Sequence, residues 1–535
     1  MSSQEYSQNT SLANQQNGMF ARWSRWTENP NVSVVLTFVI GLVVALSLAF
    51  YVQPLPRVHD EFSYLLAADA FSQMETSAQT HPHWQHFESF HIIHQPRYAS
   101  KYPPGQGLIL AAGNWIGHPI IGSCITTAFA LAAVMWLAIG WIKKQDHGWA
   151  ALLLATHPGI HVIWGQTYWS GCLAMGGSAL LVGALFRMKP TPKIHCSILA
   201  GIGSSLMMVT RPFEGLVLTA VVGVLLLYRL LVNKEWPLNK FLLRIILPGM
   251  LVTATAFGML LAYNASVTGK ATTFPYQLHE DQYNWNRIFF WQGHKDLKPE
   301  YRHETIASFY ENDVRDKLAS NETLGSLISE KLNFAIVLQY LFFGSTFLLG
   351  GFGIAPIFKD RNYWLPVALF VVPLVAAFLT AWKNTHYAAP SAALILMLAV
   401  ACFFAARDRI HNPLYVRLFI VLAITLHIAW FAREVHAVST VNKLGWFKSR
   451  YDIETNLKNE AGKDLVFVRY SDSHKLNREW VYNKLKIDGS EIVWAREMSH
   501  AENQKLIDYF YDRNVWLVQP ESNESLIKPY HYEVR

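Results

Sequence analysis

The sequence predicts a polytopic α-helical membrane protein with about 11 transmembrane helices and a small extracytoplasmic α/β domain at its C-terminus. Composition is the first observation behind this class: 52% of the 535 residues are apolar and only 16% are charged. The second is that apolar runs of about 20 residues, the length that spans a bilayer, recur along the chain. Lys and Arg are scattered, so the net charge of +7 does not indicate a nucleic-acid partner.

A polar stretch, residues 1–32, is expected to form a cytoplasmic N-terminal tail before a transmembrane domain over 33–434. The expected spans are 33–52, 120–142, 148–165, 168–187, 194–210, 212–232, 243–265, 333–356, 363–382, 389–406 and 415–433. An interrupted apolar stretch at 106–118 is expected to be a surface or re-entrant helix. Counting it as a span would turn every basic loop outward, against the positive-inside rule.

This topology places two long loops, 53–119 and 266–332, on the outer side together with residues 435–535. The C-terminal segment alternates strand-like and helix-like runs, which is typical of a small α/β unit. The strand-like runs are 464–470, 480–487, 491–497 and 514–520, with a helical run at 502–512. The clearest domain boundary is expected near residue 434.

Asp60 and Glu61 follow directly after the first expected span. Adjacent carboxylates at a membrane surface cost desolvation free energy unless they are paired or functional. One carboxylate could act as general base on an acceptor, and the other could orient it. The alternative is that Asp60 caps an amphipathic surface helix and that Glu61 occupies its first turn.

Five histidines lie between residues 81 and 94, and three of them, His81, His83 and His86, are the candidates for a metal site. No second rigid set of ligands follows them, so hydrogen bonding and interfacial packing are the alternative roles. We therefore assign no cofactor, and a divalent cation stays an open alternative.

The candidate substrate-binding residues are cations and aromatic residues on the same outer side. Cations there could stabilise an anionic headgroup such as a phosphate, whereas snorkelling at the interface is the alternative. The candidates are Arg97, Lys101, Tyr102, Arg211, Tyr276, Lys383, His386 and Tyr387.

The strings HDEFSYLLAADAF (59–71) and YASKYPPGQG (98–107) resemble a bacterial branch of the GT-C glycosyltransferases. That family includes protein O-mannosyltransferases and the aminoarabinose transferase of lipid A. The resemblance continues through TRPFEGL (210–216), YNASVTG (263–269), HYAAP (386–390) and EWVYNKLKID (479–488). It implies a GT-C-like transmembrane domain with a catalytic first outer loop. Carried over, Asp60 is the catalytic acidic residue and Glu61 assists it.

The resemblance also implies the reaction. We expect a glycosyltransferase that moves a hexosyl or pentosyl group from a polyprenyl-phosphate-linked donor to a glycan, lipid or protein acceptor. The expected place is the outer face of a bacterial cytoplasmic (inner) membrane, whose lipids would be further partners. The alternative from another class is a transporter or flippase of lipid-linked sugars. Transporter sites usually lie at mid-membrane, whereas the ionisable residues here lie at the outer ends of spans.

Overall fold

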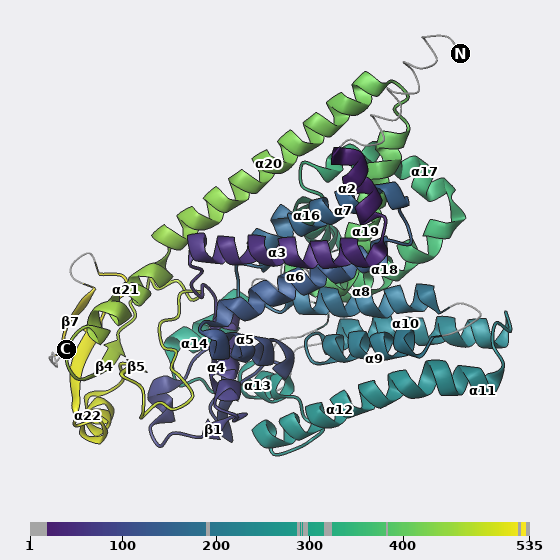
Figure 1. Ribbon diagram of the computed structural model, residues 1–535. Helices are drawn as coiled ribbons and strands as arrows, with labels where there is room; N and C mark the ends of the chain where they lie inside the picture. The colour runs from purple at the N-terminus through teal and green to yellow at the C-terminus, as the bar shows by residue number, and fades with distance from the viewer. Residues whose placement is uncertain are drawn as a thin grey trace, which may run out of the picture.

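The computed structural model describes residues 19–188, 193–285, 289, 292, 298–314, 324–380, 384–522 and 526–530. A bundle of helices forms the larger part, and a small unit containing a β-sheet packs at one end of it (Figure 1). The long helix α20 (Pro413–Leu444) runs obliquely along the bundle and leads into that C-terminal unit. The C-terminal unit shares an apolar core with the first long loop.

Seven helical stretches of the described chain are long and apolar enough to cross a membrane, and a bent pair makes an eighth if it counts as one span. The seven are α3 (Pro30–Val52), α6 (Pro119–Ala138), α10 (Pro212–Leu231), Leu238–Thr268 (α11, Leu238–Lys240; η4, Phe241–Ile246; α12, Leu247–Thr268), Arg361–Phe378 (η7, Arg361–Tyr363; α18, Trp364–Phe378), Thr385–Asp408 (η8, Thr385–Ala388; α19, Ala389–Asp408) and α20. In the bent pair, α16 (Leu324–Phe343) meets η6 (Phe347–Gly353) and α17 (Ile354–Lys359) at 99°.

The structure therefore supports seven or eight spans rather than about 11. Three expected spans are shorter helices in the bundle. The first is split by Pro158 into α7 (His147–Ala155) and the π-helical η3 (Gly159–Trp164). Nine residues of α-helix reach only about 14 Å, half of a bilayer core. The others are α8 (Gly171–Arg187) and α9 (Ile194–Met208), with 17 and 15 residues.

Several of these helices expose apolar side chains to the outside of the bundle. Val35, Val39 and Val43 of α3 are exposed at a spacing of four residues, on one helical face. Only 11% of the apolar window of Leu238–Thr268 and 17% of that of α20 are buried. Apolar faces of this extent need lipid around them, so the chain is a multi-pass membrane protein. Helix α19 lies inside, with 83% of its window buried.

The first long loop forms its own small substructure at one end of the bundle. It contains α4 (His59–Ser72), α5 (Pro104–Ile116), the short helix η1 (Trp84–Phe87) and a sheet of order β1-β3-β2. Its strands are β1 (Ala78–Gln79), β2 (Ile92–Ile93) and β3 (Arg97–Ser100), paired antiparallel. Helix α4 does not lie on an open surface as expected, because the C-terminal unit covers it and most of its residues are buried.

The C-terminal unit contains a four-stranded sheet of order β5-β4-β6-β7. Strand β4 (Lys463–Val468) pairs parallel with β5 (Ile492–Arg496) and β6 (Arg513–Val518), and β7 (Ile527–Pro529) is antiparallel to β6. The helices are α21 (Trp446–Lys458) and α22 (His500–Tyr509). The predicted strand at 480–487 is wrong, since this segment contains no strand. The expected boundary near 434 falls within α20.

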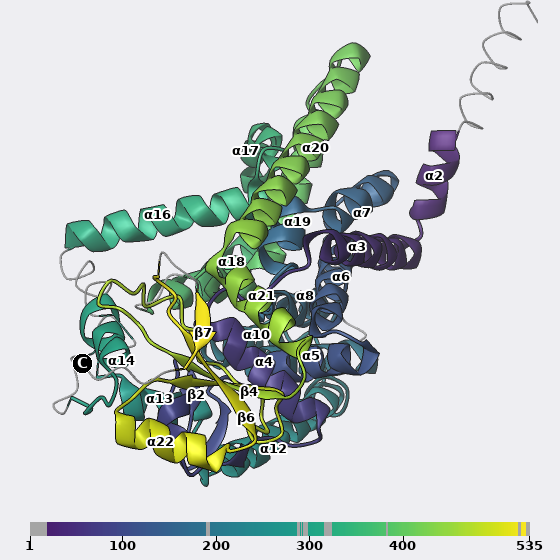
Figure 2. The same cartoon turned by 90° about the vertical axis from the view of Figure 1, so that its left-hand side faces the viewer.

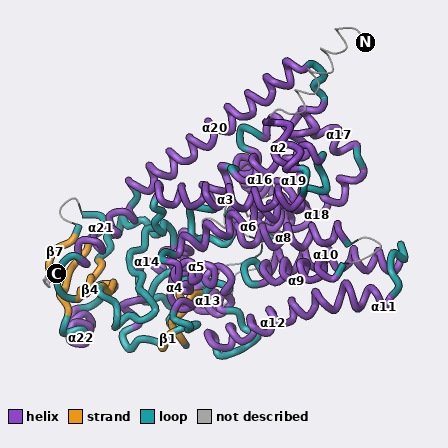
Figure 3. The backbone as a smooth tube through the Cα atoms, in the orientation of Figure 1, coloured by secondary structure: helices purple, strands orange, loops and turns teal. Residues whose placement is uncertain are grey.

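The remaining described elements are short and mostly connect the spans or the outer loops. They are α2 (Met19–Thr27), η2 (Lys144–Asp146), α13 (Pro275–Tyr283), α14 (Glu304–Ser308) and the π-helical η5 (Phe309–Asp313). In Figure 3, α14, α4 and α13 lie between the sheet and most of the bundle, and Figure 2 looks onto the same end with the C-terminal unit in front.

Side chains of the segment 480–487 join the C-terminal unit to α4. Tyr482 stacks on Phe62 with ring centroids 4.1 Å apart and planes within 4°. The backbone N–H of Leu485 donates a 2.8 Å hydrogen bond to Asp69 Oδ2. This segment packs on α4 and meets strand β5 through the side chain of Asn483 rather than through a backbone ladder, which explains why its alternating pattern does not produce a strand.

Candidate active site

Asp60 lies in the first turn of α4. The helix begins at His59, and its N-cap is Val58, which makes no side-chain cap hydrogen bond. Asp60 therefore does not cap the helix. Its side chain is 20% exposed and points toward polar groups from other parts of the first long loop.

The carboxylate of Asp60 is held by Tyr102. The phenol donates a 2.5 Å hydrogen bond to Oδ1, and Oδ2 lies 3.7 Å from Nδ1 of His91. Nδ1 of His91 is also 3.1 Å from the Tyr102 oxygen. Because a phenol has one proton, and Asp60 accepts it, this contact requires His91 to donate from Nδ1. Burial, and then the charge of Asp60, raise the pKa of Tyr102 well above its usual value and keep the phenol protonated.

His91 is held firmly in this chain of hydrogen bonds. Its backbone lies in the left-handed region, with φ of 62°, which is uncommon for a residue other than glycine. Its carbonyl accepts a 2.7 Å hydrogen bond from Ser63 Oγ. Burial, and then the neighbouring charges of Lys101, His59 and His279, lower the pKa of His91 well below its usual value, so the ring is neutral.

Glu61 points away from Asp60 and binds backbone. Its Oε2 accepts a 2.6 Å hydrogen bond from the N–H of Arg57, and Oε1 accepts a 3.1 Å hydrogen bond from the N–H of Tyr168. The residue is only 2% exposed, and burial raises the pKa of its carboxyl group despite these hydrogen bonds. Glu61 thus ties the start of α4 to the loop that precedes α8.

Lys101 is paired with Glu280 rather than open to solvent. Its Nζ lies 3.3 Å from Glu280 Oε1, and each side chain is only 6% exposed. The ammonium also lies 4.8 Å from the ring centroid of Tyr276 and 5.6 Å from that of Tyr102. Burial alone would raise the pKa of Glu280, but the charge of Lys101 and the hydrogen bonds of His279 and Asn284 lower it to about 2.

Arg211, His386 and Tyr387 come together from two other segments. The guanidinium of Arg211 lies 4.5 Å from the ring centroid of Tyr387, which stacks on His386 at 5.2 Å. Nε of Arg211 and Nδ1 of His386 are buried and have no hydrogen-bond partner. Arg211 interacts electrostatically with Tyr64 and Tyr102, so this group of side chains adjoins Asp60.

Two predicted cations are not part of this cluster as the structure describes it. Arg97 donates from Nε to Ser77 Oγ at 2.7 Å. Ser77 follows the C-terminal end of α4, whereas Asp60 lies at the start of this helix, about 20 Å away along its axis. Lys383 lies outside the described residues.

The three candidate metal ligands make separate contacts with the C-terminal unit. Nε2 of His81 lies 2.8 Å from Asp488 Oδ1, and Nδ1 of His86 lies 2.9 Å from the carbonyl of Arg496. Nδ1 of His81 accepts from the backbone of His83. Within the described ranges, no group of three or more His, Cys, Asp and Glu residues is arranged to hold a metal ion.

Sequence reasoning missed three residues of the cluster: His91, Tyr64 and Glu280. Tyr64 follows Asp60 by four residues, so one face of α4 presents both, and its ring stacks on that of Tyr102 at 4.4 Å. Glu280 follows Tyr276 by four residues on α13. The i,i+4 spacing was therefore a usable signal for both residues.

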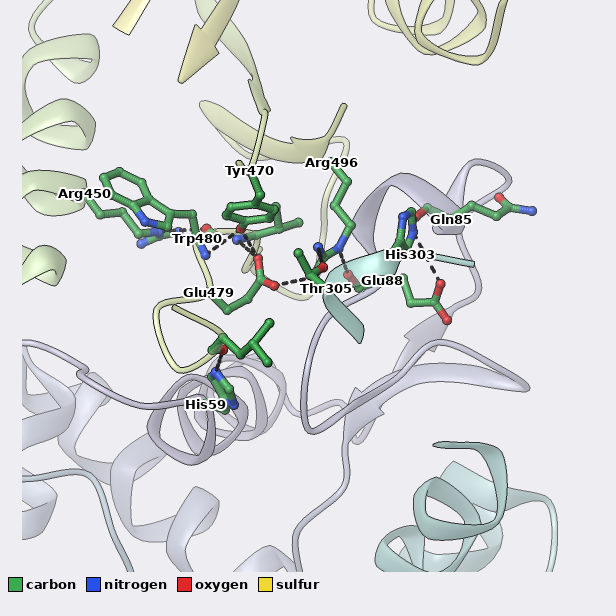
Figure 4. A network of polar contacts seen from close by, with 12 residues as sticks. His59, Gln85, Glu88, His303, Thr305, Arg450, Tyr470, Glu479, Trp480 and Arg496 are labelled. Carbon is green, nitrogen blue, oxygen red and sulfur yellow. Dashed lines mark hydrogen bonds and ion pairs between the residues drawn. The ribbon is translucent and has the colours of Figure 1, made fainter. Parts of the chain in front are cut away.

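A buried ionic network connects this site to the C-terminal unit (Figure 4). Arg496, at the end of β5, pairs with Glu479, and these side chains are 3% and 0% exposed. Arg496 also donates to the carbonyl of Glu88 at 2.6 Å and to Thr305 Oγ1 at 2.7 Å. Nearby, Nε2 of His59 lies 3.0 Å from the carbonyl of Leu476. Both long loops are therefore fixed to the C-terminal unit next to Asp60.

The sequence matches no protein-family model and no curated protein, but solved structures share its fold. ArnT from Cupriavidus metallidurans, solved bound to undecaprenyl phosphate, superimposes with a TM-score of 0.52 over 91% of this chain and 92% of that chain, at 13% identity. The chain has a GT-C fold. The Archaeoglobus fulgidus oligosaccharyltransferase, solved in complex with Zn and sulfate, gives a TM-score of 0.50 at 12% identity, over 90% of this chain and 67% of that chain.

The end of the bundle opposite Asp60 is hollowed. A cavity of 1020 Å³ is lined by residues of the basic connections, among them Lys143, Arg187 and Arg229, and contains none of the predicted site residues. Helix α6 begins next to the first long loop and ends at this cavity, so the two ends of the bundle differ in chemistry.

Proposed function

We propose that the protein is a glycosyltransferase that moves a sugar from a polyprenyl-phosphate-linked donor to an acceptor on the outer face of a bacterial inner membrane. One observation carries the proposal: two buried nitrogens without partners, Arg211 Nε and His386 Nδ1, adjoin a carboxylate that Tyr102 holds in place. A buried unpaired donor is costly, and a phosphate oxygen would satisfy it. The binding of undecaprenyl phosphate by ArnT, which shares the fold, supports this donor class.

In the proposed reaction, Asp60 removes the proton from an acceptor hydroxyl or amine. The acceptor atom then attacks the anomeric carbon of the sugar, and the bond between that carbon and the phosphate oxygen breaks. The electron pair of the broken bond stays on the lipid phosphate. Arg211 and His386 stabilise this negative charge as it develops, and attack opposite to the leaving group inverts the anomeric centre.

The other residues of the cluster position these groups. Lys101 is neutralised by Glu280, so we assign it to the placement of Tyr102 and Tyr276 rather than to direct capture of phosphate. Glu61 fixes the start of α4 through its two backbone hydrogen bonds. Lys383 stays a candidate phosphate ligand because it precedes His386 by three residues. The acceptor class, whether glycan, lipid or protein, is not assigned by these contacts.

Sugar transfer by the purified protein tests the proposal. Lipid-linked sugars extracted from the native membranes would serve as donors, and envelope material from the same cells would serve as acceptor. We expect radiolabelled sugar to pass to the acceptor and the polyprenyl phosphate to be released in equal amount. Failure to transfer, when donor binding is demonstrated, would contradict the proposal.

One feature favours the transporter alternative, namely the bent pair of α16 and α17. Broken spans line substrate sites in many transporters, and this pair turns by 99°. Reconstituted vesicles separate the two functions. A transporter would move a fluorescent lipid-linked sugar between leaflets without an acceptor, whereas we expect no such movement above the rate of protein-free vesicles.

A further inference from the structure

A polar cleft of 510 Å³ lies between the C-terminal unit and the described segment 298–314 of the second long loop. Residues that follow β4 and β5, including Tyr470 and Met498, line one side, and Thr305 and Ser308 of α14 line the other. In parallel sheets, ligands bind outside the carboxyl ends of the strands, where the strand order reverses. The order β5-β4-β6 contains such a reversal, because the chain passes from β4 to β5 and then crosses to the other side of β4.

The strongest charges that line this cleft are already matched. Arg469 makes a two-pronged ion pair with Glu497, and Arg496 is paired with Glu479. Further carboxylates line the cleft, among them Asp472. A polyanion requires unmatched cations, so these walls suit a neutral ligand that both donates and accepts hydrogen bonds.

One nitrogen in the cleft wall has no partner. The side chain of His474 is only 2% exposed, and its Nδ1 lies 2.5 Å from Glu521 Oε1. Its Nε2 is buried and makes no hydrogen bond. An unpaired buried nitrogen is unfavourable, and a ligand hydroxyl in the cleft would pair with it.

The cleft does not suit an extended peptide added to the sheet, because such a peptide needs a free strand edge. Strand β5 is the edge strand on this side of the sheet. The side chain of Asn483 already occupies that edge, donating to the carbonyl of Trp494 at 2.8 Å and accepting from its N–H at 2.9 Å.

The inner end of the cleft reaches the candidate active site. Leu476 lines the cleft, and its carbonyl lies 3.0 Å from Nε2 of His59, the neighbour of Asp60 (Figure 4). We propose that the cleft binds a hydroxyl-rich saccharide, the carbohydrate part of the acceptor, and directs its nucleophile toward Asp60. This inference rests on the proposed function for the role of the saccharide, but saccharide binding itself does not require a donor.

Binding of saccharides released by mild acid from the native cell envelope tests the inference, measured on the full-length protein in detergent by saturation-transfer NMR. Ser308→Trp and Met498→Trp would fill the cleft, and we expect each to weaken binding at least tenfold. His474→Phe keeps an aromatic ring of similar size and removes both ring nitrogens, the unpaired Nε2 and the Nδ1 that contacts Glu521, and we expect a similar loss. Asn456→Trp, on the exposed face of α21, is the matched control and should bind as wild type.

Thermal unfolding of each variant shows whether it is folded, and only variants with the wild-type midpoint are compared. Equal binding by the cleft variants and wild type would overturn the inference, as would no binding to wild type at millimolar saccharide. Cleft-dependent binding by a protein that never transfers sugar would reject the proposed function and leave the saccharide site standing.

Discussion

The phenol of Tyr102 donates a 2.5 Å hydrogen bond to the carboxylate of Asp60, although the two residues are 42 positions apart. The bond joins the first turn of α4 to the segment between β3 and α5. It fixes one carboxylate oxygen and leaves the other, Oδ2, 3.7 Å from His91. A general base needs this kind of placement, with one oxygen held and the other available to a proton.

Tyr102→Phe removes this hydrogen bond and keeps the ring. A hydrogen bond to a charged group is worth about 1.5–3 kcal/mol, so we expect the rate of transfer to fall by roughly 10- to 150-fold. Donor affinity should change little, because the phenol holds the base and not the lipid phosphate. Single-turnover kinetics measure both quantities. Tyr228→Phe, at an exposed position of α10, is the matched control, and equal rates for the two variants would contradict the role of Tyr102.

Arg211→Met and Arg97→Met are expected to differ sharply, although both residues were predicted from sequence to bind substrate. The guanidinium of Arg211 lies over the ring of Tyr387, and its Nε has no hydrogen-bond partner. Nε of Arg97, in contrast, donates a hydrogen bond to Ser77. Loss of a charged hydrogen bond to the phosphate should weaken donor binding by roughly 10- to 150-fold in Arg211→Met. Arg97→Met should stay within about threefold of wild type by the same reasoning. Equilibrium dialysis in detergent measures the donor affinity of both variants. Weaker binding by Arg97→Met than by Arg211→Met would contradict the assignment of the phosphate site to Arg211.

Lys101→Met should destabilise the protein strongly. It leaves the carboxylate of Glu280 buried without its cation, and breaking a buried pair in this way costs about 3–5 kcal/mol. The double variant Lys101→Met with Glu280→Gln removes both charges and should recover much of the loss. Thermal unfolding in detergent measures both variants. Equal destabilisation by the single and double variants would show that the pair itself is unimportant.

The ion pair of Lys101 and Glu280 also predicts that the stability of the protein depends on pH. The folded-state pKa of Glu280, about 2, lies below its ordinary value of 4.5. Stability from this depressed pKa is therefore fully present above about pH 4.5 and is lost as the pH falls toward 2. The gap in stability between wild type and the double variant should shrink over that window. A gap that stays constant down to pH 2 would contradict the assignment.

Glu61→Gln should affect stability through backbone contacts. Each carboxylate oxygen accepts from a backbone N–H, of Arg57 and of Tyr168. The amide nitrogen of Gln cannot accept, so one buried N–H loses its partner at a cost of about 1–3 kcal/mol. Chemical denaturation compared with Glu75→Gln, a half-exposed side chain past the end of α4 that pairs with Lys486 at the surface, measures this cost. A stability equal to that of the control would mean that Glu61 does not anchor the helix.

The sequence predicted the membrane class and three strands of the C-terminal unit, at 464–470, 491–497 and 514–520, because periodicity reports directly on burial. The residue pattern alone could not separate Asp60 from Glu61, since both lie in the first turn of one helix, and only the family resemblance assigned them different roles. Their different roles come from tertiary partners: Tyr102 reaches Asp60, and the loop before α8 reaches Glu61. A local pattern contains no information about such distant contacts.

The pairing of Lys101 with Glu280, 179 positions away, was invisible for the same reason. The extra spans were expected because apolar content alone does not distinguish a membrane-crossing helix from a short one buried in the bundle. Helix α8 illustrates this, since 15 of its 17 residues are buried among other helices. Whether an apolar helix crosses the membrane depends on its length and on breaks such as Pro158. Apolar content does not report where a helix ends.

Sugar transfer by Asp60→Asn tests the central claim most directly. The amide keeps the shape of the side chain and can still accept from Tyr102, but it cannot remove a proton at neutral pH. We predict that the purified variant binds the lipid-linked donor as wild type does and transfers sugar roughly 100- to 10,000-fold more slowly, the range typical of a lost general base. Transfer at the wild-type rate, with donor binding intact, would contradict the account and move the chemistry away from α4.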